Sequence, residues 1–418
     1  MKKKIAIIGL GYVGLPLYLL LNKLKFETYG FDVNKHKIEL LNKNISYNSD
    51  ILSSDLKKIK KKFFFSMDHI FKISKCDYIV ICLPTPLIGK TPDMSSIIDA
   101  FNKMFKFLKK GHTIILESTV YPGATKDIFE KKLNRKFTIG KNFYLTYSPE
   151  RIDPGKKDFT PYSEITKLIS GYSKNCLKKI KFLYSKIFKN IYVCNTIEIA
   201  EFSKLFENAY RAVNIGLVNE IKILLNQMKL DMNEVVAAAS TKPFGFTQFS
   251  PGPGMGGHCI PIDPVFISWI GKKYNFTTKF IDLSVKINRK VADWIYNKIY
   301  NYRFKSKTKS FLVLGLAYKK NINDSRESPA VYIIKKLLKN KNLKIDYFDP
   351  YIPEIKIGNK IIKSIINISA KILKGYSAVI IFTDHDNINY KKILKNSNII
   401  FDTRGVYAGV NSQKIIKL

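Results

Sequence analysis

Short apolar runs alternate with longer stretches of mixed polarity along the first third of the chain. Lys4–Ile8 is an apolar run that predicts a strand, and the glycine-containing segment after it predicts a helix that ends near Lys23. Glu27–Asp32 predicts a second strand, and apolar runs at 77–83 and 113–117 predict two more, with a helix between them. Strands that alternate with helices favour a parallel sheet covered by helices.

The same alternation returns near the C-terminal end. Residues 310–319 predict a strand that runs into a turn at Gly315. Ser328 and Pro329 suit the N-cap and the first position of the helix that follows. Three further apolar runs predict strands at 344–348, 378–383 and 399–402. A second doubly wound domain is therefore expected, but without a complete dinucleotide fingerprint.

Between these regions, residues 200–229 contain no proline and a single glycine, Gly216. One helix of about 30 residues, ~45 Å long, is expected there. Its apolar residues follow helical spacing and are Phe202, Leu205, Phe206, Ala209, Val213, Leu217, Ile221, Leu224 and Met228. The fold class expected is α/β, with two doubly wound Rossmann-like domains joined by a long central helix. The expected domains are 1–195, a central helical region at 196–300, and 301–418.

The formal net charge of +38 does not by itself indicate a nucleic-acid partner. Most of the 71 basic residues are lysines scattered among isoleucines and asparagines. Base readout and bidentate phosphate contacts favour arginine, so no nucleic-acid partner is expected. The seven arginines are Arg135, Arg151, Arg211, Arg289, Arg303, Arg326 and Arg404.

Five cysteines without regular spacing predict neither a disulfide framework nor a zinc site, and a reducing, cytoplasmic location is expected. The N-terminal lysines and the apolar run up to Leu21 imitate a signal peptide. That run contains glycines of a nucleotide fingerprint and continues into a strand, so we interpret it as the start of the fold. No apolar stretch reaches ~18 residues, and no membrane span is expected.

Gly9, Gly11 and Gly14 have the Gly-x-Gly-x-x-Gly spacing of a dinucleotide fold, between a predicted strand and a predicted helix. The pyrophosphate of a cofactor would lie at the N-terminus of that helix. Asp32 closes the second strand, where a carboxylate would accept hydrogen bonds from ribose hydroxyls and repel a 2′-phosphate. NAD is therefore the expected cofactor.

Three predicted strands end in loops of unusual composition, at 84–86, 118–123 and 148–151. Ligands bind beyond the carboxyl ends of parallel strands, so Thr119 and the loop of Pro84 are expected beside the nicotinamide. Glu150 could act as a base or order a water molecule. The alternative is that proline and glycine simply end these strands.

The segment 251–263 places Cys259 in a loop rich in glycine and proline, with Asp263 four residues further on. A thiol there could capture an aldehyde that NAD has just produced, and glycines would let a substrate approach the backbone closely. The alternative is a buried cysteine that serves as a small hydrophobic residue. His258 suggests a Cys-His dyad, but adjacent side chains usually diverge, so Asp263 is the better polar candidate.

Lys204, Asn208 and Arg211 share one stripe of the central helix. Such a stripe is ordinarily a solvated face. A lysine, an amide and a scarce arginine could instead form a wall of donors facing the loop of Cys259, and fixed donors stabilise oxyanions. In the C-terminal region, Lys319, Arg326 and Arg404 could hold a diphosphate.

These motifs together resemble the UDP-glucose/GDP-mannose dehydrogenase family over nearly the whole chain. The resemblance is strongest to members that act on UDP-N-acetylglucosamine, whose sequences are similar to 241–246 followed by Pro-Gly-Pro-Gly. The segments that carry it are Gly9-Leu-Gly-Tyr-Val-Gly14, Ser118-Thr-Val-Tyr-Pro-Gly123, Ser148-Pro-Glu-Arg151, Lys204 with Asn208, Gly256-Gly-His-Cys-Ile-Pro-Ile-Asp263 and Arg326-Glu-Ser-Pro329.

The resemblance implies oxidation of carbon 6 of the sugar from alcohol to carboxylate with two NAD, through a thiohemiacetal and a thioester on Cys259. It also implies a homodimer built on the long helix. The catalytic residues implied are Cys259, Lys204, Asn208, Asp263, Glu150 and Thr119. Cofactor contacts are implied for Gly9, Gly11, Tyr12, Val13, Gly14, Asp32, Lys37, Pro84, Thr85, Thr119 and Arg326. UDP-sugar contacts are implied for Glu150, Arg151, Lys204, Asn208, Arg211, Gly256, Lys319 and Arg404.

Two departures from the family pattern matter. No arginine occurs between Arg211 and Arg289, where UDP-glucose enzymes carry one that contacts the sugar, so UDP-glucose is disfavoured. Pro154 stands where those enzymes have a second acid, which leaves the base for hydrolysis open. UDP-N-acetylmannosamine and UDP-N-acetylgalactosamine remain alternative substrates.

Two other functions stay open. A two-electron dehydrogenase of the hydroxyacid type would share the N-terminal fold and the Lys-x-x-x-Asn pair, and would form one NADH per product without needing Cys259. A non-catalytic nucleotide-sugar or nucleic-acid binding protein would show no turnover, and nucleic-acid binding would weaken steeply with salt.

Overall fold

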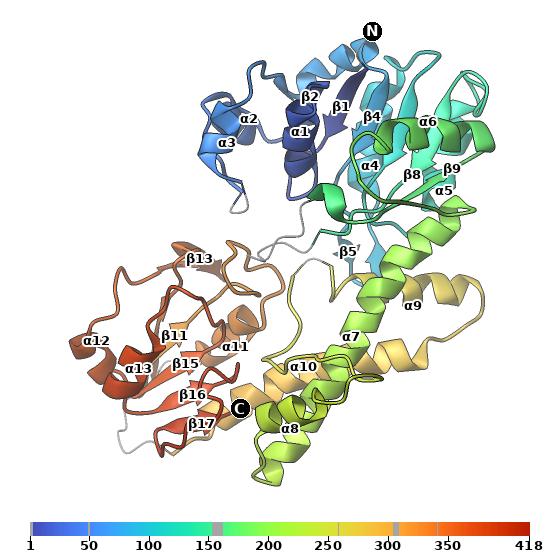
Figure 1. The fold of residues 1–418 in the computed structure, drawn as a ribbon. Coiled ribbons are helices and arrows are strands. Elements are labelled where there is room, and N and C mark those ends of the chain that lie inside the picture. The colour runs from blue at the N-terminus through green and yellow to red at the C-terminus, as the bar shows by residue number, and fades with distance from the viewer. Residues whose placement is uncertain (1–2, 49–50, 153–161, 258, 304–308, 341) are drawn as a thin grey trace. The chain divides into compact units, whose positions relative to one another are not determined.

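The computed structural model describes residues 3–48, 51–152, 162–257, 259–303, 309–340 and 342–418. The chain forms two compact units, shown together in Figure 1. The N-terminal unit comprises Met1–Glu207 and Val265–Phe276, and the C-terminal unit comprises Asn208–Pro264 and Thr277–Leu418. This division passes through the long helix, so the three expected domain ranges stay a prediction.

The N-terminal unit is built on an eight-stranded sheet in the order β10-β9-β8-β7-β4-β1-β2-β3. All pairings are parallel except that of β8 with β9. The strands are β1 (Lys4–Ile8), β2 (Glu27–Asp32), β3 (Phe64–Ser66), β4 (Tyr78–Ile81), β7 (Thr113–Leu116), β8 (Tyr144–Tyr147), β9 (Lys167–Gly171) and β10 (Ile191–Val193). A small hairpin pairs β5 (Leu87–Ile88) with β6 (Thr91–Pro92).

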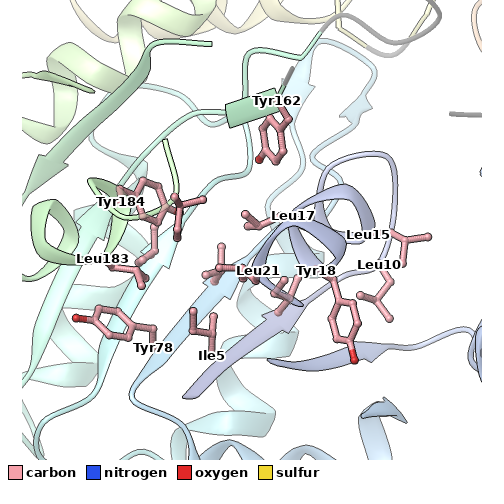
Figure 2. Packing of buried hydrophobic residues seen from close by; sticks show 14 of the residues in the cluster. Ile5, Leu10, Leu15, Leu17, Tyr18, Leu21, Tyr78, Tyr162, Leu183 and Tyr184 are labelled. Carbon is pink, nitrogen blue, oxygen red and sulfur yellow. The ribbon is translucent and has the colours of Figure 1, made fainter. Parts of the chain in front are cut away.

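The helices of this unit pack an apolar face on the sheet. Figure 2 shows part of one core, in which Leu17, Tyr18 and Leu21 of α1 share a buried cluster with Ile5 of β1 and Tyr78 of β4. The helices are α1 (Gly14–Lys23), α2 (Lys35–Asn42), α3 (Ser53–Lys57), α4 (Ser95–Phe105), α5 (Ala124–Leu133) and α6 (Lys174–Tyr184), with 3-10 segments η1 (Met67–Lys75) and η2 (Tyr162–Glu164).

The long helix α7 spans Ile197–Gln227 and confirms the single helix expected there. Its polar stripe is not a solvated face, because Lys204 and Asn208 are buried. Its apolar residues divide instead between two faces. Leu205 and Ala209 are buried, whereas an exposed face carries Phe202, Phe206, Tyr210, Leu217, Leu224 and Met228. The helices that follow are α8 (Met232–Ala239), α9 (Asp263–Lys273) and α10 (Lys279–Tyr300).

The C-terminal unit contains a parallel five-stranded sheet in the order β12-β11-β15-β16-β17, which confirms the second doubly wound region. Its strands are β11 (Lys309–Leu314), β12 (Leu343–Phe348), β15 (Ala378–Ile381), β16 (Ile400–Asp402) and β17 (Ile415–Lys417), beside the hairpin of β13 (Glu354–Ile357) and β14 (Lys360–Lys363). Its sheet is covered by α11 (Pro329–Leu337), α12 (Ala370–Lys374) and α13 (Tyr390–Asn396), together with α10.

Two expectations about local structure need correction. Strands expected at 77–83 and 378–383 are shorter, because the chain leaves the sheet at Ile81 and Ile381 to form loops. Ser328 is the N-cap residue of α11, but its hydroxyl makes no capping hydrogen bond and is buried without a partner among the described residues. No helix in the described part of the chain combines the length and apolar character that a membrane span needs.

Candidate active site

The glycine fingerprint forms a tight turn between β1 and α1. Gly9 has a φ of +94°, and a methyl carbon there would lie 2.4 Å from the carbonyl oxygen of Cys82. A methyl carbon on Gly14 would lie 1.9 Å from the carbonyl oxygen of Gly9. At Gly11 the corresponding position has no described atom within 4 Å. A tight turn, close packing of the helix and an open backbone are what a dinucleotide pyrophosphate requires.

Asp32 ties this turn to the end of β2. Its Oδ2 accepts a hydrogen bond from the N–H of Leu10 at 3.0 Å, and its Oδ1 accepts one from the N–H of Asn34 at 2.9 Å. The hydroxyl of Tyr47 donates to the carbonyl of Leu10, and the ammonium of Lys37 lies 5.1 Å from the centre of the Tyr47 ring. The carboxylate is therefore held at the turn, and ribose recognition stays a prediction.

The loops that follow β4 and β7 are joined by two hydrogen bonds. Thr85 Oγ1 donates to the carbonyl of Thr119 at 2.6 Å, and the N–H of Leu83 donates to Ser118 Oγ at 2.8 Å. Thr119 is half-buried and Pro84 is exposed. The structure thus brings together the two loops that were expected to border the nicotinamide.

Helix α5 begins directly after the second of these loops, and its N-cap residue, Gly123, has no side chain. Glu201 of α7 supplies the missing acceptor. Its carboxylate accepts from the N–H of Gly123 at 2.6 Å, from the N–H of Thr125 at 2.9 Å and from Thr125 Oγ1 at 2.6 Å. Burial raises the pKa of Glu201 to about 7, although these hydrogen bonds favour the ionised form. Helix α7 therefore fixes the end of the Thr119 loop.

Glu150 follows β8 and has both carboxylate oxygens occupied. Its Oε1 accepts from the N–H groups of Arg151 and Ile152 at 2.6 and 2.7 Å. Its Oε2 accepts from the Tyr162 hydroxyl at 2.6 Å and from Lys167 Nζ at 2.8 Å. Four fixed donors occupy the positions that a water proton would need. The geometry therefore favours ordering of the turn at 148–151 over proton transfer, and the role of Glu150 as a base stays a prediction.

Lys167 lies between two buried carboxylates, Glu150 and Glu117, and its Nζ is 3.2 Å from Glu117 Oε2. The Tyr184 hydroxyl donates to the other oxygen of Glu117. Burial alone would raise the pKa of Glu150, but the charge and hydrogen bond of Lys167 lower it. For Glu117 burial prevails and the pKa is raised. The cluster thus holds Glu150 ionised.

The side chain of Arg151 contacts two groups of the N-terminal unit. Its Nη2 is 2.7 Å from Glu207 Oε1, and its Nη1 donates to the carbonyl of Thr166 at 2.9 Å. These contacts fix the guanidinium beside α7. The expected substrate contact of Arg151 stays a prediction.

On α7, Lys204 is only 9% exposed and makes no hydrogen bond or ion pair with any described residue. One turn later, Asn208 Nδ2 donates to Asp263 Oδ2 at 2.5 Å. Arg211 is half-buried. The side chain of Lys204 is thus buried along most of its length, and its ammonium is available to an anionic group of a ligand.

Cys259 begins the turn that leads into α9. Its carbonyl accepts from the N–H of Ile262 at 3.0 Å and from the N–H of Asp263 at 2.8 Å. The thiol is half-buried and free, and Asp263 is the first residue of the helix. The turn, with the Asn208–Asp263 hydrogen bond, places the predicted nucleophile beside two of the predicted polar groups. His258 and Pro154 lie outside the described residues.

The glycines before Cys259 serve the packing of the protein itself. A methyl carbon on Gly256 would lie 2.5 Å from Tyr318 Cβ, and one on Gly257 would lie 2.8 Å from the Tyr318 ring. Gly257 has a φ of +89° and donates its N–H to the carbonyl of Arg326 at 3.0 Å. The expectation that these glycines make room for substrate is therefore incomplete, because Tyr318 occupies the space.

The three basic residues expected at a diphosphate lie in the C-terminal unit near this loop. Arg404 donates from Nε to the carbonyl of Phe382 at 2.7 Å and from Nη2 to the carbonyl of Tyr318 at 3.3 Å. Arg326 pairs with Asp324 at 2.6 Å. Lys319 directly follows Tyr318 and is half-buried. The structure therefore connects Arg404 to Tyr318, which packs on the cysteine loop, and Arg326 to the same loop through the N–H of Gly257.

Several residues of these clusters are not among the site residues that the sequence predicts. Lys167 and Glu117 form the buried ion cluster, Glu201 caps α5, and Asn219 and Lys222 of α7 contact the cysteine loop. A lysine at the start of the apolar strand β9 was the one available signal for Lys167. The others resemble ordinary polar positions of a helix.

Comparisons with known proteins agree along the chain. Residues 3–188 match the NAD binding domain of the UDP-glucose/GDP-mannose dehydrogenase family, 198–290 match its central domain and 312–409 match its UDP binding domain. A UDP-N-acetyl-D-glucosamine 6-dehydrogenase from Salmonella typhi is 32% identical over 417 residues, 96% of each chain. A UDP-N-acetyl-D-mannosamine dehydrogenase from Methanococcus vannielii is 31% identical, over 97% of this chain and 93% of that one.

The solved structure of a UDP-D-ManNAc dehydrogenase from Pyrococcus horikoshii has a TM-score of 0.83 at 28% identity, and covers 96% of this chain and 95% of that one. The cofactor is NAD, since the glycine turn and Asp32 have the geometry for it and the matching domain binds it. On the sequence, the fold and the matched domains together, the chain belongs to the UDP-glucose/GDP-mannose dehydrogenase family of nucleotide-sugar dehydrogenases.

Proposed function

We propose that the protein oxidises carbon 6 of UDP-N-acetylglucosamine to the carboxylate, with two NAD per sugar. The observation that carries this proposal is the largely buried side chain of Lys204, whose ammonium has no partner among the described residues, one helical turn from Asn208 and its hydrogen bond to Asp263. An anion that forms only during the reaction would supply the missing partner of Lys204. Oxyanions of a thiohemiacetal and of thioester hydrolysis are such anions.

NAD, when bound, accepts the two hydrides. The fingerprint glycines would hold its pyrophosphate at the start of α1, and Asp32 would hold its ribose. The joined loops of Thr85 and Thr119 would border the nicotinamide, and Thr119 would help to place the water or the reacting hydroxyl. Arg326 would contact the cofactor from the C-terminal unit.

In the first half of the reaction, carbon 6 loses a hydride and its hydroxyl loses a proton, which gives an aldehyde. The thiolate of Cys259 adds to the carbonyl carbon and forms a thiohemiacetal, whose oxyanion Lys204 and Asn208 stabilise. A second hydride leaves this carbon and a thioester results. Capture on Cys259 keeps the aldehyde from escaping.

In the second half, water adds to the thioester, the carbon–sulfur bond breaks and the carboxylate departs. The balance is one alcohol, two NAD and one water to one carboxylate, two NADH and three protons. Asp263, held by Asn208, is the acceptor proposed for a proton of the water. Glu150, with its oxygens occupied, keeps the turn before Arg151 in place.

UDP-N-acetylmannosamine is the second candidate substrate. Relatives named for each sugar are about equally similar to this chain, at 32% and 31% identity. The preference for N-acetylglucosamine rests on the Thr241-Lys-Pro-Phe-Gly-Phe segment before the cysteine loop. Arg211, Lys319 and Arg404 would hold the UDP part in either case.

The decisive measurement is NADH formed per UDP-sugar consumed, with the N-acetylglucosamine, N-acetylmannosamine, N-acetylgalactosamine and glucose forms as separate substrates. Two NADH with UDP-N-acetylglucosamine as the preferred substrate supports the proposal. One NADH per sugar would overturn it in favour of a two-electron dehydrogenase, and no turnover would favour a binding protein.

Replacement of the nucleophile gives a sharper prediction. Cys259→Ala should abolish formation of the acid, and Cys259→Ser should stall at a slowly hydrolysed ester that mass spectrometry can detect on the protein. Cys76→Ser is the control, because Cys76 is also a free cysteine but precedes β4, at the opposite end of that strand from the loop of Pro84. Wild-type turnover in Cys259→Ala would exclude the covalent mechanism.

We also propose that the protein acts as a homodimer through the exposed apolar face of α7. Phe206, 61% exposed, and Leu217, 55% exposed, lie on this face among other large apolar residues. A patch of this kind on a helix is typical of a buried interface. Sedimentation analysis of the wild type and of Phe206→Glu tests it, and a dimeric Phe206→Glu variant would contradict it.

A cytoplasmic location is proposed, since a reactive thiol and a supply of NAD both belong there.

A further inference from the structure

Gly252, in the loop that leads to Cys259, is held by helix α7 through both of its peptide groups. Its N–H donates to Asn219 Oδ1 at 3.0 Å, and its carbonyl accepts from Lys222 Nζ at 3.3 Å. Asn219 and Lys222 are three residues apart and therefore lie on one face of the helix. The loop is thus fixed seven residues before the predicted nucleophile.

Lys222 also reaches the end of strand β16. Its Nζ donates to the carbonyl of Thr403 at 3.3 Å, and the next residue is Arg404. A methyl carbon on Gly252 would lie 2.8 Å from Arg404 Nη1. The same ammonium therefore joins the cysteine loop to the strand end that carries the arginine proposed to bind the diphosphate.

A second helix fixes the orientation of Asn219. Its Nδ2 donates to Asn288 Oδ1 at 3.0 Å, and Asn288 Nδ2 donates to the carbonyls of Ala212 and Ser284 at 3.1 and 3.0 Å. Asn219, Lys222 and Asn288 are all buried. A buried network whose members all have partners makes the surrounding structure rigid.

Lys222 is a costly residue at this position. It is 5% exposed, and burial lowers its pKa to about 7, with a further contribution from the charge of Arg404 and an opposing one from Asp402. It borders an open hollow whose other charged side chains are Asp402 and the pair of Asp231 and Lys417, which lie 2.5 Å apart. A neutral amine still has two N–H groups, which suffice for both carbonyls. An apolar residue would serve stability better, so its retention points to a role in positioning.

We propose that Asn219 and Lys222 are positioning residues that hold the cysteine loop and Arg404 as one body, so that a sugar nucleotide bound by Arg404 meets Cys259. The part about the sugar nucleotide rests on the proposed function. Neither side chain needs to touch the substrate, because each acts through backbone groups of Gly252 and Thr403. The fit between the nucleotide site and the nucleophile is then set inside the C-terminal unit.

The test uses the full-length protein with Lys222→Met, which keeps the length of the side chain but removes its donors, and Lys222→Arg, which restores them. Asn219→Ala removes the second side-chain contact with Gly252. The contacts of Asn219 and Lys222 with Gly252 and Thr403 together form the clamp. Asn226→Ala is the matched control, since Asn226 lies on the same helix and hydrogen-bonds only the Lys417 carbonyl among the described residues. Circular dichroism and thermal unfolding verify that each variant is folded.

Four quantities are measured: KM and kcat for UDP-sugar oxidation, the Kd for UDP by calorimetry, and the rate at which iodoacetamide alkylates Cys259, followed on its peptide by mass spectrometry. We expect Lys222→Met and Asn219→Ala to raise KM and the Kd for UDP by about tenfold and to change the alkylation rate severalfold. Lys222→Arg should recover most of the loss, and Asn226→Ala should behave as the wild type.

UDP affinity and alkylation do not depend on turnover, so they separate failure of the clamp from failure of the proposed function. Wild-type UDP affinity and alkylation in both Lys222→Met and Asn219→Ala would overturn the proposal. An equal increase in the Kd for NAD, whose proposed pyrophosphate and ribose contacts are in the N-terminal unit, would also overturn it, because the effect would then not be confined to the clamp.

Discussion

Two buried lysines, one in each unit, face opposite electrostatic environments. Lys167 contacts the carboxylates of Glu117 and Glu150, and these raise its pKa although burial opposes them. Among the described residues, Lys222 Nζ hydrogen-bonds two backbone carbonyls and no carboxylate, and burial lowers its pKa to about 7. Similar burial thus gives opposite outcomes, because a full negative charge compensates desolvation and a carbonyl dipole does not.

Lys167 and Lys222 therefore illustrate two different roles of a buried lysine. The ion cluster of Lys167 sustains the turn that carries Glu150 and keeps that residue ionised. Lys222 has no ion-pair partner in the described part of the chain and is present at a cost to stability, which fits a residue that orders a loop. Variants at each position, and at a third buried ionisable residue, test this distinction.

The largest effect is expected for Lys167→Met. Removal of the ammonium leaves Glu117 and Glu150 facing each other without a cation, and breaking a buried pair in this way costs about 3–5 kcal/mol. The free energy of unfolding from urea denaturation measures the loss. Lys167 contributes this stability below the ordinary lysine pKa of 10.5, and the contribution disappears as the pH rises through its higher folded pKa.

A matched variant checks the physical reason. Lys167→Met combined with Glu117→Gln and Glu150→Gln removes the cation and both anions together, so it should be more stable than Lys167→Met alone. Equal stability of the single and triple variants would show that charge compensation is not what Lys167 supplies.

The next effect concerns the pH dependence at Lys222. Its folded pKa of about 7 lies below the unfolded value of 10.5, so the folded state binds fewer protons between these values. Stability then rises with pH across that window. Relative to Lys222→Met, the wild type should gain on the order of 2 kcal/mol between pH 7 and pH 10. A constant difference between the two proteins would contradict a buried, uncompensated lysine.

The smallest effect on stability is expected for Glu201→Gln. Its pKa of about 7 lies above the ordinary value of 4.5, so the folded state binds more protons between pH 4.5 and 7 and stability falls as the pH rises through that window. Glu201→Gln should remove this slope while costing about 1 kcal/mol of capping. Parallel pH profiles of the two proteins would show that the hydrogen bonds at the N-terminus of α5, and not burial, control Glu201.

The sequence predicts the central strands of both sheets, because they are apolar runs of the right length, but it does not predict β3, β9, β10 or β17 or the two hairpins. It also predicts the turn of Gly9, Gly11 and Gly14, since steric demands of the backbone are local. It does not predict which face of α7 is buried, because the helix carries apolar residues on two faces and only tertiary packing selects between them. Phe206, on the apolar side of the helix, is exposed, whereas Lys204, on the polar stripe, is buried.

The candidate site divides in the same way. The sequence places Cys259 and Asp263 four residues apart, and the helical stripe indicates that Asn208 faces this loop, but the hydrogen bond between Asn208 and Asp263 is not predicted. It gives no sign that Tyr318 occupies the space left by Gly256, or that Glu150 meets Lys167. Those contacts join segments that are far apart in the chain, and no local pattern encodes them.

The unbroken course of α7 carries a consequence for how this sequence can change over time. The directions of five side chains are set by the rotation of one continuous helix, in which successive residues are rotated by about 100°. These side chains are Glu201, Lys204, Asn208, Asn219 and Lys222. Substitutions on the outer face of the helix leave this rotation intact, whereas the insertion of a single residue near position 214 would rotate the clamp away from Gly252 while the cap on α5 stayed in place. Related chains should therefore keep the number of residues between the cap and the clamp, whatever substitutions they carry along the rest of the helix.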